Sequence, residues 1–164
     1  MPEVFVAAGS NIRPRAHLRG AVAALTANWP KLRTSRAWSN AAFGFAGDDF
    51  INLVVAFETG ESLAQVLARL KAIEVASGRQ TGAPKWAART LDLDLLLYGD
   101  LVGRFAGARL PRADLAERAY VLGPLAELAP DRIHPLLGEK IGVLWERFDR
   151  AAHPMREVSL EGED

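Results

Sequence analysis

Two acidic side chains stand in an intensely apolar run, RTLDLDLLLY, which extends from Arg89 to Tyr98. Alternation of leucine with another residue is the period of a β-strand, on which successive side chains point to opposite faces. Asp92 and Asp94 are therefore predicted on one face, about 7 Å apart along the strand. At an effective dielectric of about 20, two charges at this distance repel by about 2 kcal/mol, so a cation is expected nearby.

Simple alternation assigns every side chain of this run to one of two faces. One face is predicted to hold Leu91, Leu93, Leu95 and Leu97, and the other Thr90, Asp92, Asp94, Leu96 and Tyr98.

Paired aspartates of this kind have two interpretations. They are suitable ligands for a hard cation such as Mg²⁺ shared with substrate phosphates, or they are inward-pointing charges that protect an edge strand. The motif is short and does not decide between them. Arg79, Lys85 and Arg89 crowd the preceding loop, which suits phosphoryl transfer, although plain solvation also explains loop cations.

Aromatic residues form a second theme. Phe43, Phe45 and Phe50 lie in or beside a glycine-bearing loop, and Tyr120 follows in a later helical segment. Core packing explains most aromatic residues, but two phenylalanines within three residues of a loop can also hold a flat ring. Asn52 shares a strand face with Phe50 and carries both a donor and an acceptor for such a ring's edge.

Composition excludes several classes of protein. The chain has 164 residues, 49% of them hydrophobic and 24% charged, which predicts one globular domain over residues 1–164. Its 20 basic and 20 acidic residues cancel, so no nucleic-acid partner is expected. The absence of cysteine excludes disulfides and thiolate sites, and no apolar run is long enough for a membrane span. A cytoplasmic location is the resulting expectation.

Other nucleophile and metal patterns are weak. The three histidines, at positions 17, 134 and 153, lack metal-ligand spacing, and Ser10 has no evident base partner. Lys71 and Glu74 lie three apart on one helix face, where an ordinary side-chain pair is the simplest interpretation.

The predicted elements mix without regular βαβ alternation, which favours an α+β layer architecture. Strands are expected at 4–8, 32–39, 50–58 and in the run with the two aspartates, with a small hairpin over 100–110. Helices are expected at 15–29, 62–77, 118–128 with an interruption at 123–124, and 140–150. The segments 40–49 and 79–88 are predicted loops, and the tail from about residue 151 is predicted to be loosely ordered.

Together these motifs resemble a known family. RTLDLDLLLYGD, preceded by Glu74, Gly78-Arg79 and Trp86, is similar to the signature of the 6-hydroxymethyl-7,8-dihydropterin pyrophosphokinases. AAGSN, FINLVVAFET and LPRADLAERAYVLGPLAELAPD extend the resemblance in the same order over residues 3 to about 137. It implies a ferredoxin-like α/β sandwich with an antiparallel sheet and helices on both faces. It also implies transfer of pyrophosphate from ATP to the pterin, giving AMP.

The resemblance further implies roles for individual residues. Asp92 and Asp94 would hold two Mg²⁺ ions, while Arg79 and Arg89 would neutralise phosphate charge from a closing loop. The implied pterin contacts are Asn40, Ala41, Phe43, Phe50, Asn52 and Tyr120. The implied ATP contacts are Lys71, Glu74, Trp86, Arg89, Leu95, Arg112 and Arg118.

The chain departs from the family pattern at several positions. Thr81 replaces a second loop arginine, Ala87-Ala88 replaces Gly-Pro, and Arg112 replaces a histidine. Lys71 replaces a common glutamine, and the loop starting at Asn40 is one residue shorter before Phe50. These departures concern nucleotide binding and efficiency more than the type of reaction.

Two alternatives come from other classes. A catalytically weak relative would only bind pterin or nucleotide, and the residues at positions 81 and 112 favour it. A ferredoxin-like RNA-binding module would require exposed aromatic side chains on central strands and a basic face, which the neutral charge and the two aspartates disfavour. The expected partners are therefore small molecules, ATP and a pterin, with the protein a monomer.

Overall fold

The computed structural model describes residues 1–42, 47–78 and 90–164. The strands in these ranges are β1 (Glu3–Ser10), β2 (Arg33–Thr34), β3 (Ala37–Asn40), β4 (Phe50–Glu58), β5 (Asp92–Tyr98), β6 (Gly103–Phe105), β7 (Ala108–Leu110) and β8 (Arg156–Val158). The helices are α1 (Pro14–Asn28), α2 (Leu63–Ala76), α3 (Ala119–Leu128) and α4 (Ile141–Arg147). None of these helices is long and apolar enough to cross a bilayer.

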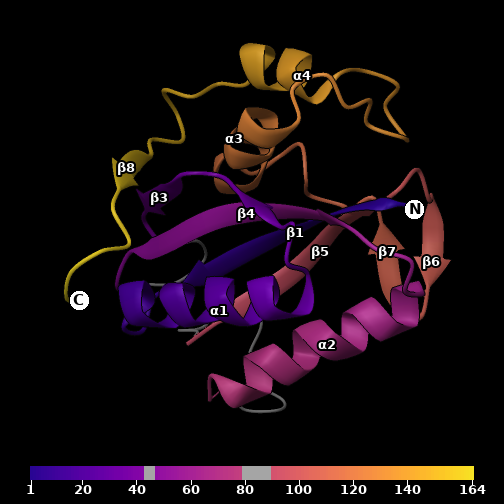
Figure 1. Cartoon of the computed structure of the whole chain (residues 1–164). Coiled ribbons are helices and arrows are strands. Elements are labelled where there is room, and N and C mark those ends of the chain that lie inside the picture. Colours follow the sequence, from indigo (N-terminus) through magenta and orange to yellow (C-terminus); the bar gives the residue numbers. More distant parts are fainter. Residues whose placement is uncertain (43–46, 79–89) are drawn as a thin grey trace.

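One antiparallel sheet organises the molecule. Its strand order is β5-β1-β4-β3-β8, with β2 also pairing with β4, while β6 and β7 form a separate hairpin. Figure 1 shows α1 and α2 below the sheet and α3 and α4 above it. The predicted α+β fold, a ferredoxin-like sandwich with helices on both faces, is confirmed.

Each face of the sheet has its own apolar cluster. On one face, Leu18 of α1 and Val66 and Leu70 of α2 pack against the strands, and all three are nearly inaccessible to solvent. On the other face, Leu122 of α3 and Ile141 of α4 are equally buried. Close packing on both faces therefore holds the strands, and the side chains they carry, in defined positions.

The helix α2 has the ends that its sequence predicts. The Ser62 hydroxyl accepts a hydrogen bond from the backbone N–H of Gln65, whose side chain in turn accepts one from the Ser62 N–H. This reciprocal cap satisfies two donors that the first turn leaves open. Gly78 follows the helix at a φ of 92°, a conformation that favours glycine.

The strand β5 contains an irregularity that its alternating sequence does not reveal. Val6 pairs with Leu95 but Phe5 pairs with Leu97, so the register shifts around Leu96. A bulge of this kind moves the following side chains to the other face. Leu97 therefore joins the cluster under α3, and Tyr98 packs on the α1–α2 side, so the predicted faces of these two residues are wrong.

The predicted second strand is divided. Ser35 lies between β2 and β3 and forms hydrogen bonds with Val54 through both its backbone N–H and its hydroxyl. Because the hydroxyl replaces part of the regular ladder, the paired register with β4 ends at Thr34 and resumes at Trp38.

The helix α3 is continuous, so the interruption expected at Gly123-Pro124 is wrong. A proline removes one backbone hydrogen bond, but Pro124 is buried together with Leu122 and Leu125 against the sheet, and this packing maintains the helix. A Cβ at Gly123 would lie 2.9 Å from Trp145, so the glycine permits close approach of α4. The helix α4 itself is shorter than predicted and ends at Arg147.

The carboxyl-terminal segment has defined contacts, unlike the loosely ordered tail expected from about residue 151. Its strand β8 pairs with β3, and the backbone N–H groups of Arg15 and Ala16 donate to the Asp164 carboxylate at 2.7 and 3.1 Å. Because Arg13 provides no side-chain cap to α1, this carboxylate satisfies donors of the first turn from a distant part of the chain.

Candidate active site

The two aspartates lie on β5, at one end of the strand order of the sheet and next to β1. Asp92 and Asp94 of β5 pair with Gly9 and Ala7 of β1, and Gly9 also pairs with Asn52 of β4 on its other side. Side chains directly opposite one another in neighbouring strands share a face, and Ala7 packs with the cluster under α3. The two carboxylates and the Asn52 amide are therefore on the face covered by α3, separated by one strand.

Gly9 leaves the space that Asn52 occupies. A Cβ added at Gly9 would lie 2.5 Å from the Asn52 Oδ1 and 3.8 Å from the Phe50 ring. Asn52 is itself buried, and its Nδ2 donates to the Oδ1 of Asn40. One amide group is thus held between a glycine on β1 and an asparagine on β3, with the half-buried Phe50 on the same strand face.

Asp94 has an unfavourable environment for a negative charge. The pKa of Asp94 is raised from 3.8 to about 7, mainly by burial and to a lesser extent by the charge of Asp92. The guanidinium of Arg112 forms an ion pair with the Asp94 carboxylate at 2.5 Å and opposes this rise without cancelling it. The side chain keeps 37% of its surface exposed, so solvent offsets part of the burial effect.

A turn before α3 supplies the cations. The backbone N–H of Leu115 donates to the backbone carbonyl of Arg112, and that of Glu117 donates to the backbone carbonyl of Asp114. These two bonds fold the segment into a turn. Asp114 accepts a hydrogen bond from the Arg112 Nε at 2.6 Å and lies 3.5 Å from the Arg118 Nε. The chain Asp94–Arg112–Asp114–Arg118 therefore joins the sheet to the start of α3.

Burial lowers the pKa of Arg112, but the nearby charges of Asp94 and Asp114 outweigh burial and raise it above the ordinary value. Burial raises the pKa of the Tyr120 hydroxyl, and the charges of Arg118 and Arg112 partly counter that shift. Tyr120 is therefore close enough to these groups for their charges to act on it.

The predicted site residues divide into two groups in the described part. Those brought together on the α3 face are Asn40, Phe50, Asn52, Asp92, Asp94, Arg112, Arg118 and Tyr120. Those associated with α2 on the opposite face are Lys71, Glu74 and Leu95. Ala41 is exposed immediately after β3.

Two of the predicted nucleotide contacts have structural roles of their own. The Glu74 carboxylate accepts a hydrogen bond from the backbone N–H of Leu93 at 2.7 Å and so ties α2 to β5. Leu95 is only 8% exposed and packs in the core cluster, whereas Lys71 is exposed. Their contacts with a nucleotide remain predictions.

Several predicted residues lie outside the described ranges. These are Phe43, Arg79, Trp86 and Arg89, together with the departures at positions 81, 87 and 88. Their proposed roles therefore remain predictions from the sequence.

Sequence reasoning missed two residues that organise the site. Gly9 belongs to the run AAGSN, which indicates a turn but not the close approach of Asn52. Asp114 stands two residues after Arg112 and four before Arg118, a spacing that could have suggested a shared carboxylate.

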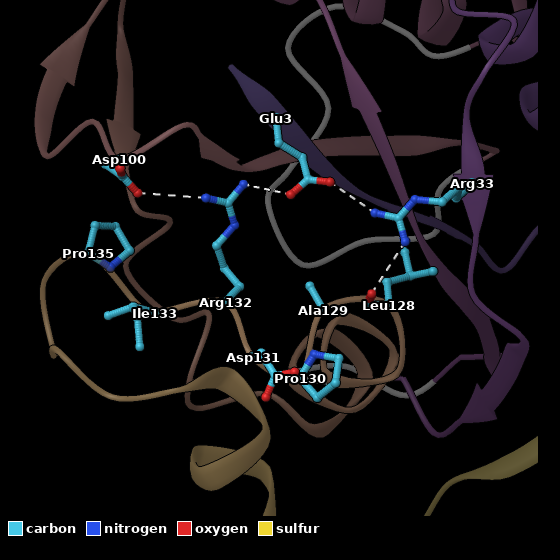
Figure 2. Close-up of a pocket in the computed structure, with 10 residues that line it drawn as sticks. All are labelled: Glu3, Arg33, Asp100, Leu128, Ala129, Pro130, Asp131, Arg132, Ile133 and Pro135. Atoms are coloured by element: carbon cyan, nitrogen blue, oxygen red, sulfur yellow. Dashed lines mark hydrogen bonds and ion pairs between the residues drawn. The ribbon is translucent and has the colours of Figure 1, made fainter. Parts of the chain in front are cut away.

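A concavity of about 770 Å³ lies at the opposite end of β1, around Glu3. Figure 2 shows Arg132 extended between Asp100 and Glu3, with Arg33 on the other side of Glu3. The Glu3 carboxylate accepts from Arg33 at 2.9 Å and from Arg132 at 2.7 Å, and Arg132 lies 3.7 Å from Asp100. These four side chains satisfy one another and contain equal numbers of acids and bases.

Comparison with known proteins agrees with this geometry. The family model for 7,8-dihydro-6-hydroxymethylpterin-pyrophosphokinase (HPPK) matches residues 5–130. A 2-amino-4-hydroxy-6-hydroxymethyldihydropteridine pyrophosphokinase of Synechocystis sp. is 40% identical over 150 residues, covering 90% of this chain and 76% of the relative. The enzyme of that name from Pseudomonas aeruginosa is 37% identical over 133 residues, covering 78% of this chain and 81% of the relative.

Solved structures show the same fold. A Plasmodium falciparum HPPK-DHPS crystal structure superimposes with a TM-score of 0.70 at 13% identity, covering 89% of this chain and 45% of the other. The chain thus spans less than half the length of that two-enzyme protein. From the extent of the family match and the identity to full-length relatives, this chain belongs to the 7,8-dihydro-6-hydroxymethylpterin-pyrophosphokinase family.

Proposed function

We infer that this chain transfers the pyrophosphoryl group of ATP to the hydroxymethyl oxygen of 6-hydroxymethyl-7,8-dihydropterin. That oxygen forms a bond to the β-phosphorus of ATP and gives up its proton to solvent. The bond from the β-phosphorus to the oxygen bridging the α-phosphate breaks, and AMP leaves. Family membership supports the reaction type, and the observation that carries the location is the pairing of Asp92 and Asp94 on the face covered by α3.

The donor set in this site fits a divalent cation. The described residues contain no group of three or more acidic or histidine side chains arranged to hold a metal ion by themselves. Two aspartates sharing Mg²⁺ with substrate phosphates do not require such a group. Burial and the charge of Asp92 raise the pKa of Asp94 more than Arg112 lowers it, so an added cation would favour the ionised carboxylate. We propose that Asp92 and Asp94 hold two Mg²⁺ ions, which would supply positive charge to the phosphates of ATP.

The remaining side chains have roles in binding and orientation. Asn52 is held in one orientation by Asn40, so its free polar groups present a defined edge to a pterin ring. Phe50 and Tyr120 provide aromatic surface, and Arg112 and Arg118 provide fixed positive charge beside the aspartates. Preorganised charge of this kind lowers the barrier because it needs no rearrangement during the reaction.

A second candidate is a catalytically weak relative that binds pterin or nucleotide without efficient transfer. The ion pair between Arg112 and Asp94 favours it, because the guanidinium binds the carboxylate that would have to bind a metal ion during transfer. The two candidates differ in one product, since only the enzyme generates AMP.

The experiment is incubation of the protein with ATP, Mg²⁺ and 6-hydroxymethyl-7,8-dihydropterin, followed by separation of AMP and the pterin diphosphate. Stoichiometric formation of both products is expected, and neither should form when Mg²⁺ is chelated. AMP without the pterin product would indicate hydrolysis instead. Binding of both substrates without either product would favour the second candidate.

A cytoplasmic location, a monomeric state and the absence of a nucleic-acid partner remain predictions. Sedimentation analysis would test the monomer. Retention on immobilised RNA at about 0.15 M salt would contradict the expectation of small-molecule partners alone.

A further inference from the structure

Asp114 contacts both arginines that border the two aspartates, although no role follows for it from the family motifs. Its Oδ1 accepts from the Arg112 Nε at 2.6 Å, and its Oδ2 lies 3.5 Å from the Arg118 Nε. The side chain is 20% exposed and the two arginines are 24% and 22% exposed. The network is therefore largely shielded from solvent, which strengthens its charge interactions.

One guanidinium is shared between two carboxylates. The Arg112 Nη1 contacts Asp94 at 2.5 Å while its Nε contacts Asp114. A planar guanidinium has separate donors for two such partners, and its single charge is divided between them. If Asp114 lost its charge, Asp94 would be the one anionic partner of Arg112 among the residues that the structure describes.

This division affects how readily a metal ion can engage Asp94. An arginine paired with a single carboxylate in a shielded site competes strongly with any other cation for that carboxylate. An arginine also held by a second carboxylate can stay in place when the first one turns to a metal. The second carboxylate therefore lowers the free-energy cost of replacing the guanidinium at Asp94 by a metal ion.

We propose that Asp114 is a positioning residue for the metal site: it retains Arg112 and so keeps Asp94 available to a divalent cation. The proposal rests on the proposed function, because it takes Asp94 as a metal ligand. It depends on Arg112, because the guanidinium at this position competes with a metal ion for Asp94 and also binds Asp114.

The test measures binding of α,β-methylene-ATP, which cannot undergo the transfer, by calorimetry over a range of Mg²⁺ concentrations. Asp114→Asn keeps the size of the side chain and an oxygen that can accept from Arg112, but removes the charge. We expect it to raise the Mg²⁺ concentration for half-maximal binding by about tenfold, the scale of lost outer-shell partners in metal sites. Asp114→Glu, which restores the charge, should lie close to wild type.

The decisive comparison is made in a second background. Arg112→Gln removes the competing guanidinium, so adding Asp114→Asn to it should leave the Mg²⁺ requirement unchanged. Asp131→Asn, an exposed aspartate 3.5 Å from Lys140, is the matched control for loss of one acid and should have no effect. Thermal unfolding of each variant verifies that the fold is retained.

Two results would overturn the proposal. One is an unchanged Mg²⁺ requirement in Asp114→Asn, and the other is an equal increase with and without Arg112. A wild-type protein that binds the nucleotide equally well without Mg²⁺ would instead overturn the metal site itself, and this inference with it.

Discussion

An ion-pair cluster lies at each end of β1, and the two differ in their balance of charge. At the Glu3 end, two acids and two bases satisfy one another, and Arg132 also lies over the Phe5 ring at 5.2 Å. At the Gly9 end, three acids, Asp92, Asp94 and Asp114, surround two described bases, Arg112 and Arg118.

The difference distinguishes a structural cluster from a functional one. A balanced cluster needs nothing from outside the protein, and removing one member costs stability alone. Among the residues that the structure describes, the Gly9 cluster has one acid more than bases, and burial together with the charge of Asp92 raises the pKa of Asp94 despite its ion pair with Arg112. An added cation stabilises such a site most strongly, and we interpret the Gly9 end as a site of this kind.

Loss of either aspartate should produce the largest effect. Asp92→Asn and Asp94→Asn keep side-chain size but remove the proposed metal ligand. Turnover should fall by at least about a hundredfold, the scale for loss of one fixed electrostatic group in an active site. AMP release under saturating substrates is the measurement. Near-normal turnover in both variants would place the chemistry elsewhere and end the contrast between the two ends of β1.

Addition of one methyl group beside Asn52 should have the next largest effect. Gly9→Ala places a Cβ against the Asn52 Oδ1, so the amide must turn out of the orientation proposed to bind the pterin. If the Asn52 amide loses about one hydrogen bond to the pterin, the KM for pterin should rise by about tenfold. The affinity for ATP should be unchanged. Gly20→Ala is the matched control, because no atom lies within 4 Å of a Cβ added there. Equal effects in both variants would contradict the close approach.

The pH dependence of stability should separate the two clusters without any substrate. Because the folded pKa of Asp94 is about 7 and its ordinary value is 3.8, the folded state binds more protons between these values. The free energy of unfolding should therefore fall as pH rises through this window, and Asp94→Asn should lack that contribution. Solvent screening limits the contribution to about 1 kcal/mol. Urea unfolding at several pH values measures it, and equal slopes in both proteins would contradict the assignment.

The smallest effect is expected at the balanced end. Glu3→Gln removes a carboxylate shared by Arg33 and Arg132, both of which remain partly accessible to water. The free energy of unfolding should fall by about 1 kcal/mol, with turnover unchanged. Thermal unfolding and AMP release are the two measurements. A marked loss of turnover would show that this end also acts in catalysis.

The main elements of the fold could be predicted from local pattern. The β-branched run from Phe50 to Glu58 forms β4 over the predicted range, and Ser62 caps α2 as its position before an apolar helix suggests. The bulge at Leu96 could not be predicted, because it depends on the register with β1 and not on the alternating sequence of β5. The capping of α1 by Asp164 depends in the same way on two distant segments.

The residue types of the candidate site could be predicted from the sequence, but the ion pairs between these residues could not. Asp92 and Asp94 were recognisable from their spacing, and the expectation of a cation nearby agrees with the position of Arg112. The nucleotide contact of Arg112 stays a prediction, and the sequence does not indicate that its guanidinium binds Asp94 and Asp114. Only the turn before α3 brings these three side chains together, and single-sequence patterns do not specify that turn.

The most direct test of the charge-balance account is the effect of Mg²⁺ on stability in the presence of α,β-methylene-ATP. At about pH 8, where Asp94 is mostly ionised, Mg²⁺ should raise the free energy of unfolding of wild type and of Glu3→Gln by about 1–3 kcal/mol. Asp94→Asn should show little of this increase, and matched ionic strength from KCl should not reproduce it. Equal stabilisation of all three proteins by Mg²⁺ would contradict the assignment of the Gly9 end as the cation-binding site.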